Sequence, residues 1–296
     1  MTDTITAIAL GIVEGITEFL PISSTGHLLI VQDFVPRQSD LFNVVIQAGA
    51  VLAVIPLFHE RFHQFLFRMK DPAVRDYLFK IMVAFVITGI GGFLMEKKGF
   101  KLPEHLLPVA VALLVGGVLF VVVEGWLAKR GHEPGTFVTW NVVLVVGIGQ
   151  LIAAAFPGAS RSGTTILFSL ILGLGRPLAT EFSFLVSIPT MLAASGYKIF
   201  KALHHPVTPV HENWNMVIIA SIVAAVVSFI VVKWFLRYVQ THTFVAFGWY
   251  RIILSLLIVV GLYTKVLNDE KEETAPAHAA VAVSFSPVQP SAQQGI

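Results

Sequence analysis

The sequence contains no cysteine and few charged residues. Asp, Glu, Lys and Arg together make up 13% of its 296 residues. Without cysteine, the chain cannot form disulfides, use a catalytic thiolate or bind a metal through sulfur. It also lacks a basic array with interleaved aromatic residues, and its formal net charge is only +2, so nucleic acid is not expected as a partner. No long polar stretch is present that could form a separate soluble domain.

Long apolar stretches make up most of the chain. The hydrophobic content is 55% and the mean hydropathy is +0.79, which is typical of a polytopic membrane protein. A membrane-spanning helix needs about 20 mostly apolar residues. Six stretches meet this need, at about 41–58, 80–96, 105–127, 180–200, 214–236 and 245–266. The N-terminal MTDTITAIALGIV lacks the basic region of a signal peptide, so we expect it to be part of the mature fold.

Two further apolar runs are interrupted near their middle. Residues 4–35 are broken by LPISSTG, and residues 138–175 are broken by FPGASRSG. Each half is short, and each break contains proline, glycine and hydroxyl residues. Irregular backbone at membrane depth is tolerated only where protein or a water-filled cavity covers it. We therefore predict two re-entrant helix–loop–helix hairpins in an all-α membrane protein.

The two hairpins resemble each other. At a near-constant offset, matching residues are Gly11 with Gly147, Glu14 with Gln150, Pro21 with Pro157, Ser24 with Ser160 and, after a one-residue slip, Gly26 with Gly163. Matched breaks indicate an inverted repeat whose site lies where the two broken elements meet. The expected organisation is one membrane domain over residues 1–267, with repeats at about 1–128 and 137–267. A disordered tail is expected over residues 268–296, where Ala, Pro, Gln and Ser predominate.

The distribution of Lys and Arg predicts the orientation in the membrane. The connection between residues 59 and 80 is the most basic in the chain and should be cytoplasmic. The first hairpin then opens on the extracytoplasmic side. Three spans separate the hairpins, so the second hairpin should enter from the opposite face.

The first break contains ionisable groups that are costly to bury in lipid. Glu14 and Glu18 are one helical turn apart, and each would cost roughly 2.5 to 3.5 kcal/mol at the centre of a bilayer. They should therefore face a polar cavity, where they can bind a divalent cation such as Mg²⁺ or Ca²⁺. Past the break, His27 can act as a general acid or base beside a hydroxyl. Groups expected to bind a substrate anion at the start of the next half-helix are Ser23, Ser24, Thr25 and Gly26.

The second break contains an arginine, whereas the first contains two acidic residues. Arg161 can bind phosphate or carboxylate through two parallel hydrogen bonds. Neighbours expected to complete an anion site are Ser160, Ser162, Gly163 and Thr165. Gln47 and Arg251, both within apolar spans, are added as candidate substrate-binding residues. Together, the acidic break and the cationic break provide what metal-assisted phosphoryl transfer requires.

These motifs resemble a known family, the bacterial undecaprenyl-diphosphate phosphatases, also called bacitracin-resistance proteins. The similarity covers nearly the whole chain to about residue 265 and rests on EGITEFLPISSTGH, FNVVIQAGAVLAV, PGASRSGTT, EFSFLVSIP and YRI. It implies an inner-membrane enzyme that removes the terminal phosphate of undecaprenyl diphosphate and so recycles the lipid carrier for peptidoglycan and other envelope polymers. The implied partners are this lipid and the bilayer, and the sequence leaves room for a homodimer.

The resemblance also assigns roles to individual residues. Glu14 and Glu18 match the family's essential acids, which serve metal binding or substrate activation. Ser24 and His27 match the proposed nucleophile and its partner, and Arg161, beside Ser160, matches the phosphate-binding arginine. Whether Ser24, His27 or a metal-bound water attacks phosphorus is left open. Two departures from the family pattern are Ala159, where an aromatic residue is common, and a longer C-terminal tail.

Two other functions fit parts of the pattern. Lipid phosphatases of the acid-phosphatase type have similar loops, but they need a histidine shortly after Ser-Arg, and SGTTILFSLILG contains none. A transporter or flippase would explain broken helices in an inverted repeat. It would not need a hydroxyl and a histidine beside two carboxylates, and a structural scaffold would explain none of the buried charge. The sequence therefore favours a phosphatase.

Overall fold

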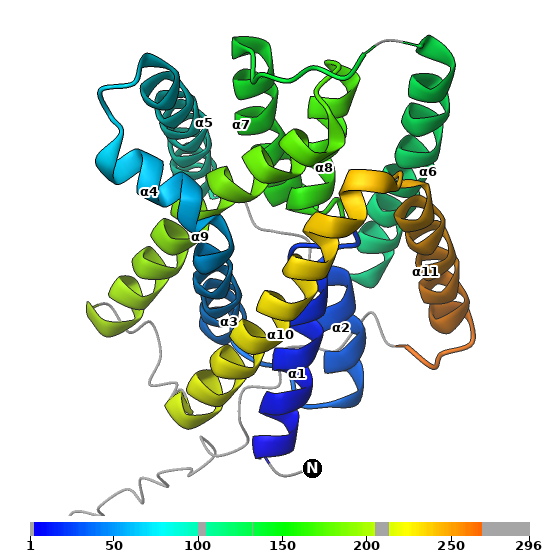
Figure 1. Ribbon diagram of the computed structural model, residues 1–296. Coiled ribbons are helices and arrows are strands. Elements are labelled where there is room, and N and C mark those ends of the chain that lie inside the picture. The colour runs from blue at the N-terminus through cyan, green and yellow to red at the C-terminus, as the bar shows by residue number, and fades with distance from the viewer. Residues whose placement is uncertain (1–2, 100–104, 132, 205–212, 268–296) are drawn as a thin grey trace, which may run out of the picture.

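The protein is almost entirely helical. The computed structural model describes residues 3–99, 105–131, 133–204 and 213–267, and no β-strand occurs in these ranges apart from a single bridge between Gly135 and Leu174. The helices, drawn in Figure 1, are α1 (Asp3–Thr17), α2 (Ser24–Phe34), α3 (Asp40–Val54), α4 (His59–Phe67), α5 (Pro72–Lys97), α6 (Leu106–Arg130), α7 (Trp140–Ala155), α8 (Arg161–Ile171), α9 (Arg176–His204), α10 (Trp214–Thr241) and α11 (Val245–Tyr263).

Six helical stretches within the described ranges are long and apolar enough to cross a membrane. They are Asp40–Phe67, Pro72–Lys97, Leu106–Arg130, Arg176–Ala202, Trp214–Thr241 and Val245–Tyr263. The predicted all-α polytopic class and the number of spans are thereby confirmed. The basic connection between residues 59 and 80 is itself mostly helical. A 3₁₀ turn at Ile55–Phe58, which contains Pro56, joins α3 to α4, and α5 already begins at Pro72. The predicted disordered tail lies outside the described residues.

Both interrupted runs form pairs of short helices. The first pair is α1 and α2, and the second is α7 and α8, with breaks at the predicted places. Figure 1 shows that the pairs approach from opposite ends of the molecule and that their breaks lie near its centre. The tip of the first pair is fixed by Phe19, whose ring lies 5.0 Å from that of Phe184 in α9.

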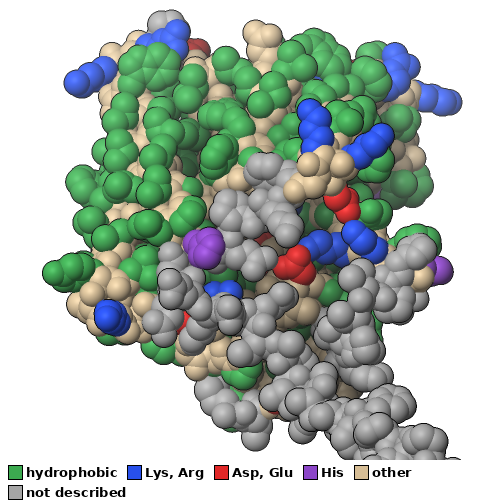
Figure 2. Space-filling model, turned by 180° about the vertical axis from the view of Figure 1, so that it is seen from behind, with side chains coloured by type: hydrophobic (Ala, Val, Ile, Leu, Met, Phe, Trp, Pro, Cys, Tyr) green, Lys and Arg blue, Asp and Glu red, His purple; other side chains and the backbone are tan. Residues whose placement is uncertain are grey.

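Close helix packing holds the short helices in place. α1 packs mainly against α10, and α7 packs against α5. A Cβ atom at Gly11 would lie 2.5 Å from the Ala220 carbonyl oxygen, so only glycine allows this approach of α1 to α10. Elsewhere α3 packs against α10 and α9, and α6 packs against α11. Hydrophobic side chains cover a broad band of the face in Figure 2, with Lys and Arg along its upper margin, as expected for a membrane protein.

Candidate active site

Two serine caps shape the breaks in the same way. Ser23 precedes α2 and Ser160 precedes α8, and each accepts a hydrogen bond from the glycine amide three residues later, Gly26 or Gly163. Both serines have left-handed φ angles, 73° and 66°. Non-glycine residues rarely adopt this conformation, and its cost is tolerated mainly where function needs it. The shared geometry aims the N-termini of α2 and α8, with their partial positive charge, at one region.

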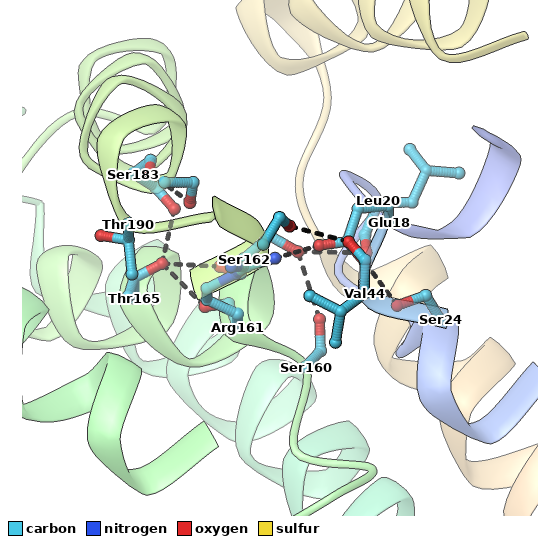
Figure 3. Close-up of polar contacts among 12 residues, drawn as sticks. Glu18, Leu20, Ser24, Val44, Ser160, Arg161, Ser162, Thr165, Ser183 and Thr190 are labelled. Atoms are coloured by element: carbon cyan, nitrogen blue, oxygen red, sulfur yellow. Dashed lines mark hydrogen bonds and ion pairs between the residues drawn. The ribbon is translucent and has the colours of Figure 1, made fainter. Parts of the chain in front are cut away.

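Glu18 connects the two breaks. Its Oε2 accepts a hydrogen bond of 2.5 Å from the Ser24 hydroxyl, and its Oε1 accepts one from Nη2 of Arg161. Figure 3 shows these side chains converging between the two ribbons. Glu18 and Ser24 are each only 8% exposed. The predicted acid, hydroxyl and arginine, which come from distant parts of the chain, are therefore brought into direct contact.

Further hydrogen bonds fix the second break against the first. The Ser162 hydroxyl donates to the Leu20 carbonyl at 3.1 Å, and Ser162 also lies 3.1 Å from the Ser160 hydroxyl (Figure 3). One turn into α8, Thr165 lies 2.5 Å from the Ser183 hydroxyl of α9. Ser162 and Thr165 were predicted to bind substrate. Their hydroxyls pair with the protein and position the second break against the first break and α9, and their substrate-binding role stays a prediction.

Arg251 is the largest correction to the predicted site. Its side chain is completely buried, and its guanidinium donates five hydrogen bonds to backbone carbonyls. The acceptors belong to the first break, the second break and α6, and they are Pro21, Gly158, Ala159, Ala112 and Leu113. A guanidinium has five N–H donors, and all are used. Arg251 is therefore not available to bind substrate and holds both loops in place.

A cavity of about 540 Å³ opens beside these groups. Among the predicted site residues, its wall includes Glu18, Ser23, Ser24, Thr25, Gln47, Ser160 and Arg161. The predicted residues Glu14, Gly26, His27, Ser162, Gly163, Thr165 and Arg251, all within the described ranges, are not part of this wall. Gly163 is needed for space, because a Cβ there would lie 2.9 Å from Nη1 of Arg251.

Glu14 is buried one turn behind Glu18. The residue is 0% exposed, and neither carboxylate oxygen has a hydrogen-bond partner among the described residues. Buried carboxylate oxygens almost always have a partner, and an isolated charge in a protein interior is costly. Glu14 thus has two carboxylate oxygens without a partner, one turn from Glu18, whose oxygens already accept from Ser24 and Arg161, and a divalent cation beside Glu14 would supply the missing partner.

His27 lies away from the Ser24 hydroxyl. Its Nδ1 is 2.7 Å from the Ser23 carbonyl, and its Nε2 is 2.7 Å from the hydroxyl of Tyr250 on α11. Both ring nitrogens are therefore occupied. The predicted pairing of His27 with the nucleophile is not seen, and Glu18 is the partner of Ser24. Tyr250 was not among the predicted site residues, although it directly precedes Arg251 in the YRI motif.

The cavity wall also contains Gln150 and Thr88, which were not predicted as site residues. Gln150 donates to the Thr88 hydroxyl at 2.9 Å, while its own Oε1 has no partner within the described ranges. The sequence contained one signal for Gln150, because it matches Glu14 in the proposed repeat. Glu181, a polar residue near the start of α9, accepts hydrogen bonds from Arg61 and Tyr77 and has a structural role.

Comparison with known proteins gives similarity over nearly the full chain. A family model described as bacitracin resistance protein BacA matches residues 7–257. An undecaprenyl-diphosphatase of Rhizobium etli (strain CIAT 652) is 48% identical over 266 residues, which are 90% of this chain and 99% of the relative. One of Xanthomonas euvesicatoria pv. vesicatoria (strain 85-10) is 45% identical over 263 residues, 88% of this chain and 98% of the relative.

Proposed function

The chain belongs to the bacitracin resistance protein BacA family, and on this premise we propose that it is an undecaprenyl-diphosphate phosphatase. It hydrolyses undecaprenyl diphosphate to undecaprenyl phosphate and inorganic phosphate, which recycles the lipid carrier for peptidoglycan synthesis. The observation that carries this proposal is the contact of Glu18 with both the Ser24 hydroxyl and Arg161. A hydroxyl beside a base, with a cation facing it, is the arrangement of nucleophilic displacement.

The geometry favours Ser24 as the nucleophile. Its Oγ attacks the terminal phosphorus, its proton passes to Glu18 Oε2, and the bond from phosphorus to the bridging oxygen breaks to release the prenyl monophosphate. Water then hydrolyses the phosphoserine and releases inorganic phosphate. Glu18 suits the role of base because the donor and acceptor oxygens are only 2.5 Å apart.

Arg161 and the helix termini stabilise the charge that develops on the phosphoryl group. Among the described residues, the Arg161 side chain has Glu18 as its hydrogen-bond partner, so further N–H donors remain for phosphate oxygens. The N-termini of α2 and α8 add backbone amides that the helices leave unpaired. Preorganised donors of this kind are usually the largest contribution to phosphoryl-transfer catalysis.

A divalent cation, Mg²⁺ or Ca²⁺, fits beside Glu14 and Glu18. The described residues contain no group of three or more His, Asp or Glu side chains that could hold a metal alone. Mg²⁺ commonly binds through one or two carboxylates and the phosphates of its substrate, which matches this donor set. When bound, the cation neutralises negative charge on the diphosphate.

Chelation of divalent cations is expected to abolish the release of phosphate. The purified protein in detergent should release phosphate from a prenyl diphosphate, lose this activity in EDTA and regain it with Mg²⁺ or Ca²⁺. Glu14→Gln should raise the cation concentration needed for half-maximal activity, because it removes a charged ligand. Full activity in EDTA would rule out the cation. No release by the folded wild type would rule out the phosphatase and favour a transporter.

The helix contacts support the two finer predictions, the re-entrant hairpins and the inverted repeat over residues 1–128 and 137–267. If α1, α3 and α5 correspond to α7, α9 and α10, the contact of α1 with α10 matches that of α7 with α5. The contact of α3 with α10 then matches that of α9 with α5. Within the proposed repeat, the matching caps favour Ser23 rather than Ser24 as the counterpart of Ser160.

We further propose an inner-membrane location with the site open to the extracytoplasmic side. The Pro72 end of α5 continues the basic connection that should be cytoplasmic, so the opposite end of α5, near Glu96, should lie outside the cytoplasm, and the cavity extends to Glu96. Because the chain lacks cysteine, a single introduced cysteine reports on which side of the membrane its residue lies.

Gln38→Cys should react with a membrane-impermeant maleimide in cells with a permeabilised outer membrane. Lys70→Cys should react only after the inner membrane is opened, and the reverse pattern would contradict the orientation. The homodimer stays a prediction.

A further inference from the structure

The cavity extends well beyond the polar groups of the proposed site. One end contains Ser24 and Arg161, whereas the other lies between α5 and α9 and reaches Phe93 and Tyr197. Phe93 is 62% exposed and Tyr197 is 48% exposed, so this end opens at the surface of the helical bundle. The cavity therefore connects the proposed catalytic groups with the surface of the helical bundle between α5 and α9, close to Glu96, whose carboxylate accepts hydrogen bonds from Tyr197 and Lys201.

Two glycines of α5 widen this second end. Gly89 and Gly92 both line the cavity, and a Cβ added to either would meet no atom within 4 Å. Gly91 differs, because a Cβ there would collide with the Leu151 side chain of α7. Gly91 thus serves helix packing, while Gly89 and Gly92 leave space open along one face of α5.

The cavity wall also contains a buried acceptor without a partner. Gln150 is 3% exposed and lies on the cavity wall, and its Oε1 has no partner among the described residues. A buried acceptor of this kind is normally satisfied by a ligand or an ordered water. The wall also includes many small and apolar residues, among them Leu151 and Ala154 of α7 and Met191 and Ala194 of α9.

We propose that the space between α5 and α9, bordered by Gly89 and Gly92, binds the first isoprene units of the substrate. This inference rests on the proposed function. A diphosphate bound at Ser24 and Arg161 must have its apolar chain leave the site, and this apolar extension belongs to the same cavity. Cavities of this size hold a drug-sized ligand, so only the beginning of an undecaprenyl chain fits. The remaining chain passes Phe93 and Tyr197 into the bilayer.

The length of the substrate's prenyl chain is the variable that tests this binding site. For the wild type, kcat/KM should rise from dimethylallyl through geranyl to farnesyl diphosphate and then level off toward undecaprenyl diphosphate. Gly92→Leu should lower kcat/KM for farnesyl and longer substrates roughly tenfold or more, the scale of a few misplaced methylenes in an apolar pocket. The same variant should change the value for dimethylallyl diphosphate less than about twofold.

Gly125→Leu provides the matched control. Gly125 is also exposed on a long helix, α6, where an added Cβ would meet no atom within 4 Å, and it does not line the cavity. The substitution should leave the chain-length profile unchanged. Gly92→Ala is the milder variant if Gly92→Leu does not fold, and it should shift the profile in the same direction.

Three results would overturn the proposal. They are an equal loss for short and long substrates in Gly92→Leu, an unchanged profile in both Gly92 variants, or the same shift in Gly125→Leu. Absence of phosphate release from every substrate by the wild type is a separate outcome, because it would contradict the proposed function itself.

Discussion

Ser24→Ala is expected to lower kcat by roughly 10³-fold or more, because it removes the atom that attacks phosphorus. Glu18 and Arg161 remain in place, so binding of the diphosphate should be retained and KM should change little. The residual rate would come from water that attacks within the same electrostatic environment. Steady-state phosphate release from a prenyl diphosphate, measured with purified protein in detergent, gives both constants.

Ser228→Ala is a suitable control for this experiment. The Ser228 hydroxyl is also fully buried, but it donates to the Gly15 carbonyl at the α1–α10 contact and does not line the cavity. Its loss should cost about 1 kcal/mol of stability and leave kcat near the wild-type value. If Ser24→Ala kept more than about a tenth of the wild-type kcat, Ser24 would not be the nucleophile.

Arg251→Leu is expected to destabilise the protein by about 2–6 kcal/mol. The substitution leaves the buried Pro21 and Gly158 carbonyls without a donor among the described residues, and each unsatisfied buried group costs about 1–3 kcal/mol. Because these carbonyls belong to both breaks, activity should fall as well. Thermal unfolding in detergent measures the stability.

The variant Arg251→Lys distinguishes the effect of the positive charge on stability from the effect of the guanidinium hydrogen bonds. Lysine keeps the positive charge but has three donors instead of five, so it should recover only part of the stability lost in Arg251→Leu. Wild-type stability of Arg251→Leu would show that the guanidinium does not hold the loops. A raised KM with unchanged stability would instead restore the predicted substrate-binding role.

The broken helices and the acid, hydroxyl and arginine of the site could be predicted from the sequence. Buried charge in an apolar chain is costly, so Glu18 and Arg161 had to find partners, and the two matched breaks supplied them. Glu18 and Arg161 are direct partners in the structure. The predicted match of Ser24 with Ser160 differs by one residue from the pair of helix caps, Ser23 and Ser160, because the similarity of short apolar segments does not define which serine caps the helix.

The roles of Arg251 and His27 depended on partners that a sequence does not reveal. A single arginine in an apolar span can face a substrate or backbone carbonyls, and only the fold brings Pro21, Gly158 and Ala159 to Arg251. Similarly, His27 follows Ser24 by three residues, but its side chain turns toward Tyr250 on a helix far away in sequence. The space beside Gly89 and Gly92 arises from helix packing and could not be predicted from composition.

The central claim is that Ser24 attacks phosphorus, and the stereochemistry of the released phosphate tests it most directly. The substrate is a prenyl β-thiodiphosphate made chiral at the terminal phosphorus with ¹⁷O and ¹⁸O, and the reaction is run in ordinary water. Attack by Ser24 followed by hydrolysis involves two in-line displacements, so the thiophosphate should be released with overall retention of configuration. Inversion would mean that water attacks directly, which would contradict the role of Ser24 and leave Glu18 to activate that water.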